Sequence, residues 1–159
     1  DCDHITGELM KGFMLKRKLS EKDRLSLAEA GGGHLAGFLQ YGIPAINLCA
    51  QNAVNTAFVN DVSAEAVYAQ MMYAYAEEND CAVCISTSGN SANVVNAAIA
   101  AKAKSIPVIS LTGKDGGKLN DFSDVVIKVP ETETYKVQEL HLPVYHFLCA
   151  ALESEMFGD

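Results

Sequence analysis

Residues 81–105, CAVCISTSGNSANVVNAAIAAKAKS, join three segments of different character. The first, CAVCIS, is a short apolar run of the kind that forms a buried strand. The last, SANVVNAAIAAKAKS, predicts a helix because alanine has the highest helix propensity. Between them lies STSGNS, in which small hydroxyl side chains surround a glycine. The stretch therefore predicts a buried strand that passes through a polar loop into a helix.

Helical and strand-like segments alternate on both sides of this stretch. The predicted helices cover 1–18, 63–78, 91–105, a turn at 117–123 and about 133–156, and the predicted strands cover 44–50, 81–86, 107–113 and 124–130. Such alternation indicates a parallel sheet with helices on both faces. We therefore expect an α/β fold, a three-layer αβα sandwich with a mostly parallel, doubly wound sheet. Residues 19–43 interrupt the pattern with a charged stretch and a triple glycine, which predicts an inserted loop–helix segment.

Length and charge narrow the possible classes of protein. A chain of 159 residues is long enough for one domain with a proper core. The net charge of −8 argues against nucleic acid as a main ligand, because binding to the phosphate backbone needs a basic face. A small phosphorylated ligand remains compatible with this charge, since a helix N-terminus can bind one phosphate through backbone N–H groups.

Three features predict where the protein works. No apolar run approaches the roughly 20 residues that a membrane-spanning helix needs. The opening DCDHITGELMKGF is acidic and polar, unlike a signal peptide. Five cysteines without a secretory segment indicate a reducing compartment. We therefore expect a cytoplasmic protein that does not bind a membrane.

The polar loop has the composition of a phosphate site. In open α/β sheets, ligands bind beyond the carboxyl ends of the strands, where this loop is expected. Gly89 permits a tight turn, and the following helix adds the positive end of its dipole. The hydroxyl groups are those of Ser86, Thr87, Ser88 and Ser91. The simpler interpretation is that one residue merely caps the helix, but a cap needs one such side chain, so we favour anion binding. The loop LTGKDGGKL at 111–119 either closes over the same place or is a plain turn.

Two helical segments carry titratable side chains. His4 and Glu8 in DHITGEL lie one helical turn apart on one face, a spacing that suits two metal ligands or an acid and a base; an exposed ion pair has the same spacing. The last helix offers Gln138, His141 and His146, and a lone histidine there is usually a core or surface group.

Another polar pair, Asn60 and Asp61, follows the strand-like NTAFV. These two side chains either bind sugar hydroxyls or form a turn or a helix start.

Taken together, these motifs resemble a known family. CISTSGNSANVVNAA, LTGKDGGKL, DVVIKVP and VQELH with a later histidine occur in the order found in sugar isomerase (SIS) domain proteins, and are most similar to the phosphoheptose isomerases. The resemblance runs from about 44 to 156, and DCDHITGEL matches that family's D-x-x-H-x-x-x-E-L. It implies a SIS domain fold, a sugar phosphate substrate, and a homo-oligomer (a dimer or tetramer; the family is homotetrameric) with active sites at subunit contacts.

The resemblance also implies roles for individual residues. The serine-rich loop, Ser86, Thr87, Ser88 and Ser91, would bind the sugar phosphate, and Asn60 and Asp61 would contact the substrate. In the family, the residues that match His4, Glu8, Gln138 and His146 ligate zinc or serve as acid and base, and the match to Gln138 also implies substrate binding. His141 matches a family histidine that has no ligand role.

The implied reaction agrees with the chemistry of these groups. Exchange between a 2-ketose and an aldose moves a proton between C1 and C2 through an enediol. A carboxylate such as Glu8 can take the carbon-bound proton, and His146 can exchange a proton with oxygen. Zinc would stabilise the enediolate oxygens as a Lewis acid, although glutamine is an uncommon ligand for it. We expect an isomerase acting on sedoheptulose 7-phosphate or a related sugar phosphate.

Three departures from the family pattern bear on these expectations. The family's glycine-rich GNGGSA loop, its strand and a long N-terminal helix come before DCDHI and are absent from the 159 residues, so we expect a single SIS domain lacking those parts. Tyr135 and Lys136 stand where the family has an acidic residue and an arginine, and the segment 19–43 is longer. The alternative function is a non-catalytic phosphosugar-binding module that acts as a regulatory or protein-partner scaffold, but Glu8 and His146 favour an enzyme.

Overall fold

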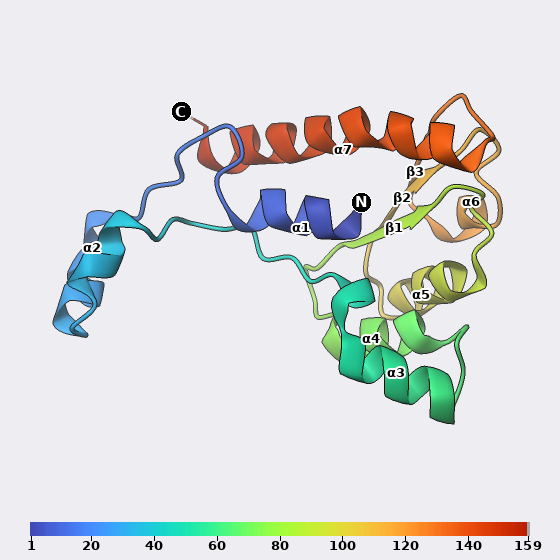
Figure 1. Ribbon diagram of the computed structural model, residues 1–159, viewed down its shortest axis with the longest axis horizontal. Helices are drawn as coiled ribbons and strands as arrows, with labels where there is room; N and C mark the ends of the chain where they lie inside the picture. Colours follow the sequence, from blue (N-terminus) through green and yellow to red (C-terminus); the bar gives the residue numbers. More distant parts are fainter. Residues whose placement is uncertain (159) are drawn as a thin grey trace. The chain divides into compact units, whose positions relative to one another are not determined.

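A computed structural model describes residues 1–158, which form two compact units (Figure 1). The first unit contains residues 1–2 and 47–143, and the second contains residues 3–46 and 144–158. The elements of the first unit are η2 (Leu48–Ala50), α3 (Asn52–Asp61), α4 (Val67–Tyr75), β1 (Ala82–Ser86), α5 (Ala92–Ala103), β2 (Val108–Thr112), α6 (Leu119–Phe122), β3 (Val125–Lys128) and the first part of α7 (Thr134–Phe157).

The first unit is built on a parallel sheet. Within the described residues the strand order is β1-β2-β3, with Ala82 paired to Val108 and Ile109 paired to Val125. Helix α5 connects β1 to β2, and α6 connects β2 to β3, as parallel strands require. The parallel α/β sheet expected from the sequence is therefore confirmed.

Small side chains let α5 pack closely on the sheet. Ala98 and Ala101 of α5 are fully buried, and they share a core with Cys84 of β1 and Val108 of β2. Figure 1 shows the sheet between α5 on one side and the first turns of α7 on the other. Alanine at these positions serves both the helix propensity of α5 and its close approach to the strands.

The strand predicted at 44–50 is wrong. Residues 44–47 form neither helix nor strand, and Leu48–Ala50 form the 3₁₀ turn η2. The Asn47 side chain starts this turn by accepting a hydrogen bond from the Cys49 N–H, a local bond that competes with strand pairing. The strand-like NTAFV lies inside helix α3, because its apolar residues recur at helical spacing, with Val54, Ala57 and Phe58 on one shallow face.

The second unit contains α1 (Cys2–Met10), α2 (Glu21–Glu29), the 3₁₀ helix η1 (Gly33–Gly37) and the latter part of α7. Figure 1 shows α1 beside that part of α7. The helix predicted over 1–18 ends at Met10, because the N–H groups of Phe13, Met14 and Leu15 all donate to the Glu153 carboxylate instead of to helical carbonyls. Helix α7 continues through Pro143, close to its predicted bounds.

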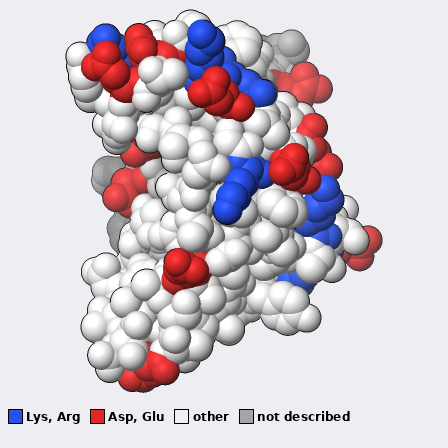
Figure 2. Space-filling view, turned by 90° about the vertical axis from the view of Figure 1, so that its right-hand side faces the viewer, with Lys and Arg blue, Asp and Glu red and all other residues white. Residues whose placement is uncertain are grey.

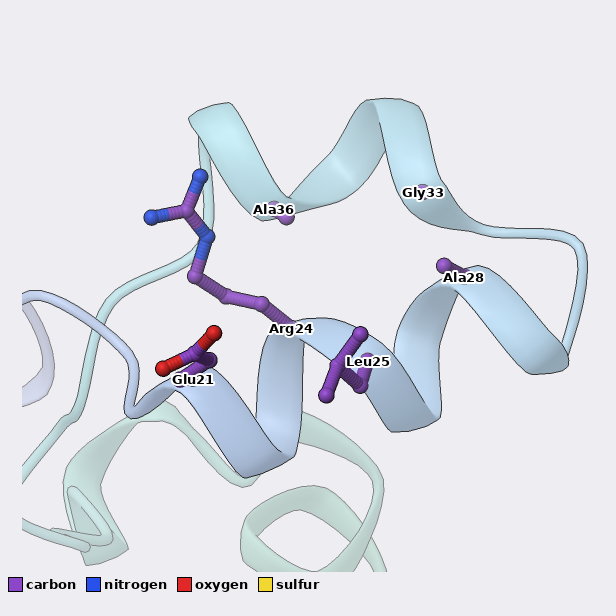
Figure 3. A pocket seen from close by; sticks show the side chains of 6 residues that line it. All are labelled: Glu21, Arg24, Leu25, Ala28, Gly33 and Ala36. Carbon is purple, nitrogen blue, oxygen red and sulfur yellow. The ribbon is translucent and has the colours of Figure 1, made fainter.

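Residues 19–43 form a segment that contains α2 and η1. A bridge between Lys18 and Gln40 closes its base. A cavity of about 470 Å³ lies between α2 and η1. Figure 3 shows Glu21 and Arg24 of α2 at one side of it. None of the sequence-predicted site residues lines this cavity.

Candidate active site

The serine loop, residues 86–91, begins at the carboxyl end of β1 and ends at the start of α5. Ser86 is buried, and its Oγ lies 2.9 Å from the Oγ of Ser91, while Ser88 and Ser91 are exposed. Ser91 occupies the N-cap position of α5, yet its side chain makes no capping hydrogen bond. The hydroxyl groups therefore line the start of the helix without capping it through Ser91, which supports the anion-binding interpretation.

The loop 113–119 packs directly against the serine loop. The Gly113 N–H donates to the Thr87 carbonyl over 2.9 Å, and the Leu119 N–H donates to the Gly89 carbonyl over 3.1 Å. The Lys118 N–H donates to Oδ1 of Asn90 over 3.0 Å. These bonds fix the backbone of the serine loop, and sequence reasoning missed the part that Asn90 plays in them.

Substitution of Gly89 tests how tightly the serine loop and the loop 113–119 pack together. Its φ is +66°, and a Cβ added there would overlap with the carbonyl oxygen of Gly116. Gly89→Ala is therefore expected to lower the free energy of unfolding by about 2 kcal/mol or more, measured by urea denaturation. Gly7→Ala is the matched control, since no atom lies within 4 Å of its added Cβ and alanine favours its helix. Equal stability of the two variants would show that the loops are not fixed as described.

Three predicted site residues come together in the second unit. Nε2 of His4 lies 3.3 Å from Oε1 of Glu8 and 3.4 Å from Nε2 of His146. His4 and Glu8 are neighbours because α1 places them one turn apart, and His146 reaches them from α7, 142 residues away in sequence. The cluster thus combines a carboxylate with two imidazoles, the groups that carry protons in acid–base catalysis.

Lys11 controls the charge of Glu8. Its Nζ donates to Oε2 of Glu8 over 2.9 Å, and this hydrogen bond is the main cause that holds the pKa of Glu8 below its usual value. Glu8 is therefore ionised at neutral pH, and its side chain is 14% exposed. An ionised, accessible carboxylate is suited to accept a proton, and the sequence interpretation had not included Lys11.

Aromatic rings surround the two imidazoles. The Tyr145 hydroxyl lies 2.9 Å from Nδ1 of His4, and its ring packs edge-on against His146 at a centroid distance of 5.1 Å. The ring of Phe13 contacts His146 on another side. Burial raises the pKa of Tyr145, so its hydroxyl is neutral. Contacts between residues so distant in sequence leave no signal in one sequence alone.

The remaining predicted residues belong to the first unit. Gln138 is exposed on α7, and Asn60 and Asp61 are exposed at the end of α3, where the Asn60 side chain donates to Asp61. Among the contacts described for residues 1–158, none joins Asn60 or Asp61 to the serine loop. The described geometry therefore groups His4, Glu8 and His146 with one another and does not group the other residues with them.

His141 is buried in the first unit. Asp1 lies 3.8 Å from its Nδ1, and neither ring nitrogen makes a hydrogen bond with good geometry in the described part of the chain. Burial lowers the pKa of His141, and although the main chain at Thr112 acts in the opposite direction, burial is the larger effect. The ring is therefore a neutral core group, unlike His4 and His146, which reach solvent.

The predicted zinc ligands fit a metal only in part. Zinc bonds of about 2.0–2.1 Å in a tetrahedron place ligand atoms about 3.3–3.4 Å apart. The His4–Glu8 and His4–His146 separations, 3.3 and 3.4 Å, match this value. Across residues 1–158, however, no group of three or more His, Cys, Asp and Glu side chains is arranged to hold a metal ion.

Comparison with known proteins identifies the family. The model of the SIS domain family matches residues 53–151. This range includes the sheet, the serine loop and most of α7, and its parallel α/β arrangement is the one described above. The chain therefore belongs to the SIS domain family.

Similar proteins within this family are phosphoheptose isomerases. The chain is 38% identical to phosphoheptose isomerase 2 of Campylobacter jejuni over 158 residues, covering 99% of the chain and 67% of that protein. It is 37% identical to the Sulfurimonas denitrificans phosphoheptose isomerase over 123 residues, covering 77% of the chain and 63% of that protein. The structure of phosphoheptose isomerase GmhA from Neisseria gonorrhoeae superposes with a TM-score of 0.75 at 30% identity, covering 97% of this chain and 70% of that one.

Proposed function

We propose that the protein is a phosphosugar aldose–ketose isomerase that converts sedoheptulose 7-phosphate, or a closely related sugar phosphate, through an enediol. The observation that carries this proposal is the cluster of His4, Glu8 and His146, which combines an ionised carboxylate with two accessible imidazoles. The similarity to phosphoheptose isomerases supports the substrate class.

The residues of the cluster divide the proton transfers between them. Glu8 takes the proton from the carbon next to the substrate carbonyl and returns it to the neighbouring carbon. His146 exchanges a proton with the substrate oxygens, and His4, in contact with both groups, supports the charge that develops during these steps.

In the proposed function, the serine loop binds the phosphate group of the substrate. Its hydroxyls and the start of α5 bind the phosphate, and the loop 113–119 holds them in place. Binding energy from a phosphate remote from the reacting carbons can then be used to orient the sugar.

A screen of C5–C7 ketose phosphates, with the unphosphorylated sugars as controls, tests this function. Turnover of a phosphorylated ketose supports it, whereas phosphate binding without turnover of any of them would favour the non-catalytic module.

Ser88→Asp tests phosphate binding by the serine loop independently of turnover. A carboxylate in the serine loop repels a phosphate, so the rise in unfolding temperature that a sugar phosphate gives the wild-type protein is expected to disappear in the variant. Thermal unfolding with and without the sugar phosphate measures this effect. Ser63→Asp, outside the serine loop, is the control and should keep the rise in temperature. Full protection of the Ser88→Asp protein would remove the serine loop from the site.

Zinc, with His4, Glu8, Gln138 and His146 as its ligands, remains a proposal. The donor types and two separations support it, and bound zinc would supply Lewis-acid stabilisation of the enediolate oxygens. Metal analysis of the purified protein, combined with turnover before and after chelation, tests this proposal.

We also propose a cytoplasmic homo-oligomer, a dimer or a tetramer, that binds neither nucleic acid nor membrane. Phe38 and Phe147 are 80% and 71% exposed, which supports burial against another copy. Figure 2 shows acidic side chains interspersed among the basic ones and a broad uncharged area, an arrangement that supports the absence of nucleic acid binding. None of the helices described has the length and apolar character needed to cross a membrane. Sedimentation measures the oligomeric state.

A further inference from the structure

Tyr145 contacts both imidazoles of the cluster, and the proton transfers proposed above do not use it. It is 3% exposed, and its hydroxyl lies 2.9 Å from Nδ1 of His4. Its ring meets the His4 ring at 5.4 Å and 74°, and the His146 ring at 5.1 Å and 86°. One buried side chain therefore contacts both histidines.

Packing alone does not explain the hydroxyl group of Tyr145. A buried hydroxyl without a partner costs free energy, so phenylalanine would fill the same space at lower cost if packing were its whole purpose. The hydrogen bond with His4 gives the hydroxyl its partner. A phenol both donates and accepts, and it therefore satisfies Nδ1 whichever His4 nitrogen carries the proton.

The hydrogen bond between Tyr145 and Nδ1 of His4 also affects where the other ring nitrogen, Nε2, points. With Nδ1 held by Tyr145, Nε2 points at Glu8 and His146, at 3.3 and 3.4 Å. His4 is 44% exposed, so packing alone leaves much of its ring free to turn. The partner of one imidazole nitrogen fixes the ring orientation in which the other nitrogen acts.

We propose that Tyr145 is a positioning residue, whose hydroxyl holds His4 so that Nε2 stays directed at Glu8 and His146. The proposal rests on the proposed isomerase function for its kinetic consequence, but the contact itself exists without a substrate. Its ring, packed against His146, holds the second imidazole in the same cluster.

Tyr145→Phe removes the hydroxyl and keeps the ring. We expect kcat for the ketose phosphate to fall by about 10- to 100-fold, as happens when the second partner of a functional histidine is lost. KM and the unfolding temperature should stay close to wild type, because the serine loop and the packing are unchanged. Tyr135→Phe, on the exposed face of the same helix, is the matched control and should keep wild-type kcat.

Nitrogen NMR of the His4 imidazole, recorded without substrate, gives a second reading. In Tyr145→Phe the Nδ1 resonance should move, because Nδ1 loses its hydrogen-bond partner, while Tyr135→Phe leaves it unchanged. Wild-type kcat in Tyr145→Phe, or an unchanged His4 spectrum, would overturn the proposal. If the wild-type protein turned over none of the sugar phosphates, the spectrum would still decide the positioning role, and the proposed function alone would fail.

Discussion

Glu8→Gln is expected to lower kcat for the ketose phosphate by about a hundred- to ten-thousandfold, the range that a positioned general base contributes. Glutamine keeps the length of the side chain but cannot take a proton from carbon. Phosphate binding depends on the serine loop, so KM should change little. The fold should also persist, because the Glu8–Lys11 ion pair is partly exposed and such pairs contribute at most about 1 kcal/mol.

Steady-state kinetics and thermal unfolding of the same preparation measure both effects. His146→Ala should lose turnover to a similar extent, since no group then exchanges protons with the substrate oxygens. Glu155→Gln changes an exposed carboxylate on α7 and serves as the control for loss of charge. Wild-type kcat in Glu8→Gln or His146→Ala would show that the acid–base assignment is wrong.

Glu153→Leu is expected to lower the free energy of unfolding by about 3–5 kcal/mol, which is the cost of leaving a buried charge without its partner. Nε of Arg17 donates to Glu153 over 2.7 Å, and both side chains are almost fully buried. Arg17 also donates to the carbonyls of Glu8 and Leu9 at the end of α1. The substitution thus removes the charge partner of one buried guanidinium and the acceptor of three backbone N–H groups.

Chemical denaturation measures this loss, with Glu155→Leu as the exposed control on the same helix. Adding Arg17→Met to Glu153→Leu should recover part of the lost stability, because no buried charge is then unpaired. Losses that simply add in the double variant would contradict the description of the two groups as a coupled buried pair.

Glu153 also predicts a pH dependence of stability. Burial acts to raise the pKa of Glu153, but the donors around it outweigh burial and lower the pKa from 4.5 to about 2. A carboxyl whose pKa is lower in the folded state contributes stability that is complete above its unfolded pKa. That contribution, roughly 3 kcal/mol, is lost as the pH falls from about 4.5 to 2. Glu153→Gln should show a shallower acid loss than wild type, and parallel curves would contradict the assigned pKa.

Local patterns were sufficient to predict much of the first unit. CAVCIS, PVISLTG and DVVIKVP each form a strand, because short apolar runs between turns have one compatible structure in a parallel sheet. Residues 44–50 were misassigned because the Asn47 side chain starts a 3₁₀ turn there. The strand-like NTAFV is helical because its apolar residues recur at helical spacing in α3. The early end of α1 depended on Glu153, which lies about 140 residues away and which no local pattern reveals.

The candidate active site was also only partly predictable from local sequence patterns. The spacing of His4 and Glu8 on one helix face is visible in the sequence, and so is the density of hydroxyls at 86–91. Tyr145 and Arg17 act through long-range contacts, and a tyrosine or an arginine at these positions has no distinctive local pattern. The residue types suggested acid–base catalysis and phosphate binding. Which other side chains support these groups depends on tertiary contacts.

Isomerisation in deuterium oxide decides whether Glu8 forms an enediol, because the proton that Glu8 carries between C1 and C2 can then exchange with solvent. We expect the aldose phosphate formed by the wild-type protein to carry deuterium at C2, and Glu8→Gln to introduce deuterium neither there nor at C1 of the ketose. Conversion that introduces no deuterium and proceeds equally fast in Glu8→Gln would contradict this role of Glu8.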